Sequence, residues 1–120
     1  MNTASFVPDE QGFYTPIENA VVHVQRLFDT YQKACFQARS PEFFALELCG
    51  EAGELANLQK KRWKGKAVAD NAIAEETADV FIALMNFANA SGVCLGAAVR
   101  AKLLNIEETR QRLQQQGELY

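Results

Sequence analysis

The sequence predicts an all-α protein with a four-helix, bundle-like architecture. Apolar residues recur at helical spacing in four long segments, and no segment alternates apolar and polar residues for long enough to form a sheet. Proline and glycine signals separate the four segments. The chain has 120 residues, which suits one domain with a modest core. We therefore expect residues 1–14 to form an N-terminal arm and residues 15–120 to form a single helical domain.

The first two expected helices begin with the same local signals. The first should run from Thr15 to about Ala38, with Thr15 as its capping residue and Pro16 at the first helical position. Ser40 repeats this capping pattern before a proline, so the second helix is expected over residues 41–62. Each segment carries an apolar stripe at helical spacing, which predicts that one face of each helix is buried.

The third and fourth helices are expected over residues 72–90 and 95–115, with Gly92 between them as a left-handed C-cap. The third is apolar on most sides, which is typical of a helix in the centre of a bundle. The fourth begins apolar and ends polar. The apolar surplus of the third helix also predicts a homo-oligomer, either a dimer or a tetramer.

Charge and composition exclude several classes of partner. The formal net charge is −3, whereas a broad nucleic-acid surface is normally basic. No apolar run is long enough to span a bilayer, and the first residues have neither the basic nor the apolar region of a secretory signal. The three scattered cysteines, Cys35, Cys49 and Cys94, form no CxxC pair. They predict a reduced cytoplasmic protein with small buried thiols.

Two pairs of acids are the main candidate for chemistry, Glu51-x-x-Glu54 and Glu76-x-x-Asp79. Residues three apart lie on one face of a helix, so each pair points two carboxylates the same way. Both pairs lie in apolar sequence, where an unpartnered carboxylate is costly to bury. Four converging carboxylates would repel one another without a cation. The expected cation is Mg²⁺, a hard ion that prefers oxygen ligands, with Mn²⁺ as a substitute.

The segments that carry these acids resemble a known family. LELCGEAGELANLQKKRWKG followed by EETADVFIALMNFANASGVCL is similar to the MazG-like, all-α nucleoside triphosphate pyrophosphohydrolases. Their hallmark is an E-x-x-E pair on one helix and an E-x-x-D pair on a second. The resemblance implies hydrolysis of a (d)NTP to the monophosphate and pyrophosphate, in nucleotide-pool house-cleaning. The resemblance also implies that the Mg²⁺ ligands are Glu51, Glu54, Glu76 and Asp79.

The chain departs from the family pattern in two places. Many members have a glutamate where this chain has Gly50. Either Glu47, one turn earlier, substitutes for it, or the site has one fewer acid. We expect Glu47 or Glu51 to take the proton of the attacking water. Many members also follow a lysine of the last helix with Asn and Arg four and seven residues later. Here Lys102 is followed by Ile106 and Thr109 at those spacings.

Five residues are expected to bind the substrate. Lys61 and Lys64 belong to a basic cluster and are candidates for phosphate contact, with a solvated helix end as the alternative. Trp63 is the candidate for stacking on the base, with packing or an oligomer contact as the alternative. Asn86 follows Asp79 by seven residues on the same helical stripe and can reach the acid pocket. Lys102 is the candidate from the last helix.

Three other functions compete with this one. A di-iron or di-manganese bundle normally uses two Glu-x-x-His motifs, but the single histidine, His23, follows Ala20 at that spacing. A non-catalytic module that binds a nucleotide or a partner is the main alternative, because of Gly50 and the altered last helix. Activity on a related metabolite such as phosphoribosyl-ATP has no feature in its favour.

Overall fold

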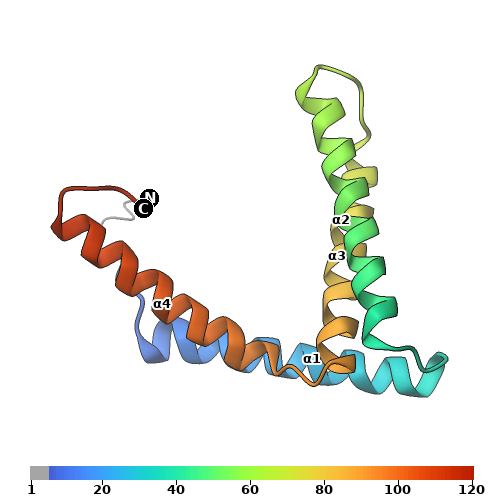
Figure 1. Cartoon of the computed structure of the whole chain (residues 1–120), viewed down its shortest axis with the longest axis horizontal. Coiled ribbons are helices and arrows are strands. Elements are labelled where there is room, and N and C mark those ends of the chain that lie inside the picture. The colour runs from blue at the N-terminus through green and yellow to red at the C-terminus, as the bar shows by residue number, and fades with distance from the viewer. Residues whose placement is uncertain (1–5) are drawn as a thin grey trace. The chain divides into compact units, whose positions relative to one another are not determined.

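The structure is a computed structural model that describes residues 6–120, and these residues contain helices and no strand (Figure 1). A short π-helix precedes four α-helices, in the order η2 (Glu10–Tyr14), α1 (Thr15–Cys35), α2 (Pro41–Trp63), α3 (Asp70–Ala90) and α4 (Leu95–Gln115). The prediction of an all-α protein with four helices is confirmed.

Most of the predicted helix ends agree with the structure. Ser40 has an extended backbone, and its side chain accepts a hydrogen bond from the Phe43 N–H at 3.3 Å, as expected of an N-cap. Gly92 has a φ of 71°, the left-handed conformation predicted for it. The helix α4 has the predicted bounds, whereas α1 ends three residues before Ala38.

The beginning of α1 differs from the prediction. Thr15 has helical backbone angles, so its prediction as a capping residue is wrong. The cap lies six residues earlier, at Asp9, whose side chain accepts a hydrogen bond from the Gly12 N–H at 2.6 Å. Part of the expected N-terminal arm is therefore helical, as η2. Residues 1–5 of that arm lie outside the described residues.

The chain divides into two compact units, and the division falls inside α1. The terminal unit contains Met1–Val24 and Cys94–Tyr120, and the central unit contains Gln25–Val93. Each unit has its own internal packing, so each is described separately.

In the central unit, α2 and α3 run side by side in opposite directions (Figure 1). Buried apolar side chains on these helices include Phe44, Ala83, Met85 and Ala88. The second half of α1 is fastened to α3 by polar contacts. The Gln25 Nε2 donates hydrogen bonds to Asn89 Oδ1 at 3.0 Å and to the Val93 carbonyl at 2.7 Å. In return, Asn89 Nδ2 donates to the Gln25 carbonyl at 3.0 Å.

In the terminal unit, the first turns of α1 approach the beginning of α4 at Gly96. This glycine is buried, and a Cβ atom placed on it would lie 2.6 Å from Val22 Cγ2 and 2.7 Å from the Glu18 carbonyl oxygen. Arg100 of α4 forms an ion pair with Glu10, and its guanidinium lies 3.9 Å from Glu18. Small size at Gly96 and charge at Arg100 therefore set the packing of this unit.

The buried core of the described residues is small, and large apolar side chains remain exposed. Leu46 and Trp63 of α2 are 75% and 83% exposed, and Phe81 and Ile82 of α3 are more than 40% exposed. All three cysteines are exposed, so the prediction of buried thiols is wrong. Among the described helices, none is by itself both long and apolar enough to cross a membrane; only α3 and α4, taken together as a broken segment, meet those criteria.

Candidate metal centre

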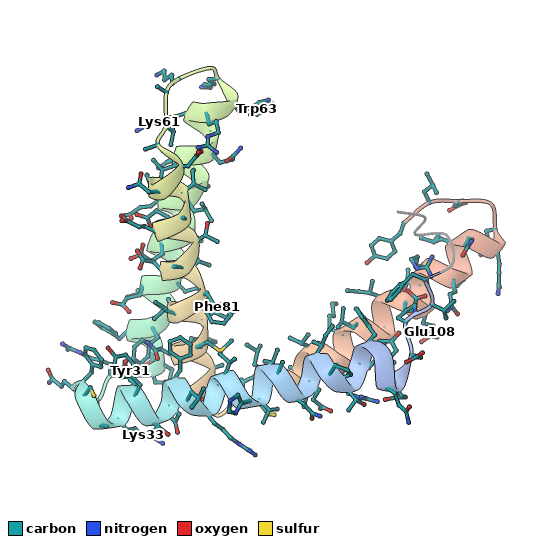
Figure 2. The ribbon with its side chains drawn as sticks, turned by 180° about the vertical axis from the view of Figure 1, so that it is seen from behind. Tyr31, Lys33, Lys61, Trp63, Phe81 and Glu108 are labelled. Atoms are coloured by element: carbon teal, nitrogen blue, oxygen red, sulfur yellow. The ribbon has the colours of Figure 1, made fainter. Side chains whose placement is uncertain are left out.

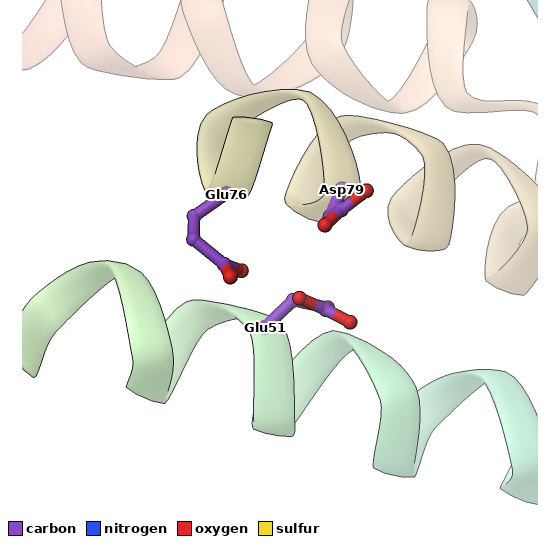
Figure 3. A group of neighbouring side chains, drawn as sticks. All are labelled: Glu51, Glu76 and Asp79. Atoms are coloured by element: carbon purple, nitrogen blue, oxygen red, sulfur yellow. The ribbon is translucent and has the colours of Figure 1, made fainter. Parts of the chain in front are cut away.

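Three carboxylates of the central unit converge between α2 and α3. Figure 3 shows Glu51 of α2 opposite Glu76 and Asp79 of α3. One oxygen from each of the three lies within 4.8 Å of the others. Because Glu76 and Asp79 are three residues apart, α3 presents both on the face that packs against α2. Three of the four acids that the sequence singled out therefore meet here, and Glu54 is not one of the three.

The close approach of these carboxylates changes the protonation of Glu76. Hydrogen bonding with Glu51, then burial, then the neighbouring Glu54 carboxylate raise the pKa of Glu76 from its ordinary 4.5 to about 7. The Glu76 Oε2 atom is shielded from solvent and has no hydrogen-bond partner within residues 6–120. A buried carboxylate oxygen without a donor is costly, and a bound proton or cation removes that cost.

The donor set suits a hard divalent cation. All three groups are carboxylates, and no histidine or cysteine lies among them. Oxygen-only ligands favour Mg²⁺, Ca²⁺ or Mn²⁺ over softer transition metals. Two of the three side chains, Glu51 and Glu76, are half-buried, and Asp79 is exposed. One side of the cluster is thus open to solvent.

The other acids near the cluster are more exposed. Glu54 influences the pKa of Glu76 and therefore lies close to it, although it is not one of the three that meet within 4.8 Å. Glu47, one turn before Glu51, is exposed. Glu75, next to Glu76 in the chain, is also exposed and lies outside the cluster.

The predicted substrate-binding residues fall in different places. Lys61 and Trp63 lie at the far end of α2 (Figure 2), and Lys64 directly follows this helix; all three are exposed. Their neighbour Arg62 is engaged within the protein, because its guanidinium donates hydrogen bonds to the Val68 carbonyl and to the Asp70 carboxylate. Lys102 is exposed on α4, in the terminal unit.

Asn86 is the predicted site residue whose position differs most from expectation. It is buried and lines a cavity that none of the clustered acids lines, formed by α1, α2 and α3 with the segment between α1 and α2. Sequence reasoning did not single out Gln32, Arg39 or Asn89, which line the same cavity. The signal was available: Asn86 and Asn89 interrupt an apolar helix with two amides three residues apart.

The fold and the cluster define an all-α chain with a candidate divalent-cation site on a helical hairpin. No protein-family model, curated protein or solved structure matches this chain.

Proposed function

We propose that this protein is a MazG-like, Mg²⁺-dependent nucleoside triphosphate pyrophosphohydrolase, which converts a (d)NTP to the monophosphate and pyrophosphate. The observation that carries the proposal is the convergence of Glu51, Glu76 and Asp79 within 4.8 Å, with Glu76 Oε2 buried and unpaired. The two acid motifs and the apolar run after Asp79, which resemble that family, support the same reaction.

Each acid then has a role that its surroundings fit. Glu51, Glu76 and Asp79 would hold the cation, with Glu54 as a fourth ligand. Bound Mg²⁺ supplies charge neutralisation of the triphosphate and activation of water. Glu47 lies outside the cluster and is exposed, so its carboxylate remains available to accept the proton of the attacking water.

The exposed basic and aromatic residues have supporting roles in this proposal. Lys61 and Lys64 make no ion pair with any described residue, so their ammonium groups are available to phosphate oxygens. Trp63 is 83% exposed and offers a face on which a base can stack.

We also propose that the working form is a homodimer or homotetramer. The exposed apolar side chains of α2 and α3 are the surface that a second copy would cover. Gly50 and Gly53 also support an oligomer. No described residue explains the choice of glycine there, because a Cβ atom on either would meet nothing within 4 Å among the described residues. A glycine inside a helix lowers the stability of the helix by about 1 kcal/mol relative to alanine. Close approach of a second chain or a ligand would explain why glycine is nevertheless present.

The test is product analysis with the full chain. Each canonical (d)NTP, and a panel of modified nucleotides, is incubated with Mg²⁺, and the products are identified by phosphorus NMR. We expect release of pyrophosphate and monophosphate. The reaction should be lost when EDTA is added and in the Asp79→Asn variant. Release of orthophosphate alone would contradict the proposal.

Binding without turnover would favour the second candidate, a non-catalytic nucleotide-binding module. The exposed position of Glu54 and the glycine at position 50 are the features that favour it. Preferential hydrolysis of modified nucleotides would support a house-cleaning role in the cytoplasm, whereas equal hydrolysis of all canonical nucleotides would oppose it.

A further inference from the structure

The central unit contains a second polar feature, a cavity of about 220 Å³. It is lined by the end of α1, the start of α2 and the last turns of α3, and two aromatic side chains, Phe36 and Phe44, form part of its wall. A single water occupies only about 10–15 Å³ by the same kind of measure. Pockets for whole drug-sized ligands measure about 300–1,000 Å³. The cavity therefore suits one ring system.

Two asparagines line this cavity and differ in one respect. Asn89 exchanges hydrogen bonds with Gln25 through both ends of its amide, at 3.0 Å each. Asn86, one turn earlier on α3, is 92% buried, and its Oδ1 has no hydrogen-bond partner among the described residues. An unpaired buried carbonyl destabilises a fold, so a buried amide of this kind is expected to have a partner. The missing partner is a hydrogen-bond donor.

The cavity also lies at a definite distance from the acid cluster. Asn86 follows Asp79 by seven residues on α3, and Phe44 precedes Glu51 by seven residues on α2. Because the two helices run in opposite directions, both displacements point the same way, by about 10 Å at about 1.5 Å per residue. The distance from the outer edge of a base, across the ribose, to the phosphates of a nucleotide is of this order.

We infer that this cavity binds the base of the nucleotide, with Asn86 Oδ1 accepting a hydrogen bond from an N–H on the edge of the ring. The inference deepens the proposed function, on which the choice of ligand rests. Phe36 and Phe44 supply apolar and aromatic surface for a flat ring. Asn86 is thus a specificity residue, and in this inference the base lies in the cavity and does not stack on Trp63, which is at the opposite end of α2.

The binding test uses nucleosides, which have no phosphate, and contains no Mg²⁺. Isotope-labelled full chain is titrated with each of the four common nucleosides and with a matched analogue in which the edge N–H is removed or methylated. At least one parent nucleoside should shift the Asn86 amide signals and bind about tenfold or more tightly than its analogue, because a site built to accept a hydrogen bond rejects a ligand without the donor. In Asn86→Ala this difference should disappear.

Three results would overturn the inference: no nucleoside binds, parents and analogues bind equally, or the difference persists in Asn86→Ala. The outcome is separable from that of the proposed function. Nucleoside binding without pyrophosphate release would retain the base site and reject the enzyme. Pyrophosphate release together with nucleoside binding that is unchanged in Asn86→Ala would retain the enzyme and reject the base site.

A matched pair of variants distinguishes a binding role from a structural one. Asn89→Leu breaks both hydrogen bonds with Gln25 and should lower the melting temperature. Asn86→Leu removes a carbonyl oxygen that has no hydrogen-bond partner among the described residues, so the melting temperature should stay the same or rise while nucleoside binding is lost. If Asn86→Leu lowers the melting temperature as much as Asn89→Leu does, Asn86 is a structural residue and the inference is overturned.

Discussion

The carboxylates of Glu51 on α2 and Glu76 on α3 face each other across the hairpin, and this approach is the main cause of the raised pKa of Glu76 (Figure 3). Two like charges held together by packed helices oppose the packing that holds them. The hairpin is therefore sensitive to anything that adds or removes one positive charge at this point.

The first prediction concerns pH in the absence of divalent cations. The pKa of Glu76 rises from 4.5 to about 7 on folding, so the folded protein binds a proton that the unfolded chain has released between these values. The free energy of unfolding should therefore contain a contribution that is present below pH 4.5 and lost as the pH rises through about 7. Chemical denaturation at half-unit steps measures it. Glu76→Gln should remove this contribution; an unchanged slope in the variant would contradict the assignment.

The second prediction concerns Mg²⁺. A cation that binds the folded state alone stabilises it, and protons compete for the same carboxylates. Saturating Mg²⁺ should raise the melting temperature more at pH 8 than at pH 5. Asp79→Asn should lose most of this effect, whereas Glu75→Gln, which removes the same charge from an exposed position on the same helix, should keep it. Equal responses in the two variants would show a non-specific ionic effect.

The third prediction concerns catalysis. Glu51→Gln and Asp79→Asn each remove one charge from the acid cluster and should lower kcat/KM for the hydrolysed nucleotide by at least about 100-fold, the effect of losing one electrostatic contact in an active site. Glu75→Gln is the matched control and should stay within about twofold of the wild-type value. Circular dichroism should show unchanged helix content in all three. Activity retained in Asp79→Asn would remove this residue from the site.

The fourth prediction concerns packing in the terminal unit. A methyl group at position 96 would meet the Glu18 backbone carbonyl at 2.7 Å, so the helices must move apart. Gly96→Ala should lower the free energy of unfolding by about 1–3 kcal/mol, the usual cost of overpacking. Gly53→Ala has open space around its new methyl group and should raise stability in the separated chain by about 1 kcal/mol. Stabilisation by both variants would contradict the close approach at Gly96.

The fifth prediction concerns assembly. Ile82 is 41% exposed in the apolar part of α3, so Ile82→Lys should lower the molar mass measured by light scattering if a second copy covers this face. Asn71→Lys, at an exposed polar position near the start of α3, should leave the mass unchanged. A wild-type monomer at working concentration would contradict the proposed oligomer.

The helices could be predicted from the sequence because their signals are local. Ser40 and Gly92 act through their own turns, and both predictions hold. The cap at Asp9 was missed because it begins a π-helix that joins α1 without a break. The division inside α1, between Val24 and Gln25, was not visible in the periodicity. An apolar stripe indicates that one face is buried, but not which helix covers it.

The acid cluster could be predicted from spacing along two helices, whereas the position of Asn86 depends on contacts between helices that spacing does not reveal. A pair such as Glu76 and Asp79 shares a helical face by spacing alone, and two such pairs in apolar sequence have one economical arrangement. The surroundings of Asn86 depend on α1 and on the segment between α1 and α2, which contact α3 only in the folded chain. Spacing from Asp79 gave its stripe, but not the cavity that it lines.

The hydrogen bonds from Gln25 to Asn89 and Val93 have a consequence for recognition. They fix the second half of α1 against the end of α3 before any ring enters between them. A ligand there meets two helices that are already in place, so the backbone need not rearrange on binding. Discrimination between rings can then depend on the pattern of donors on their edges, and less on how far the protein must rearrange to enclose them.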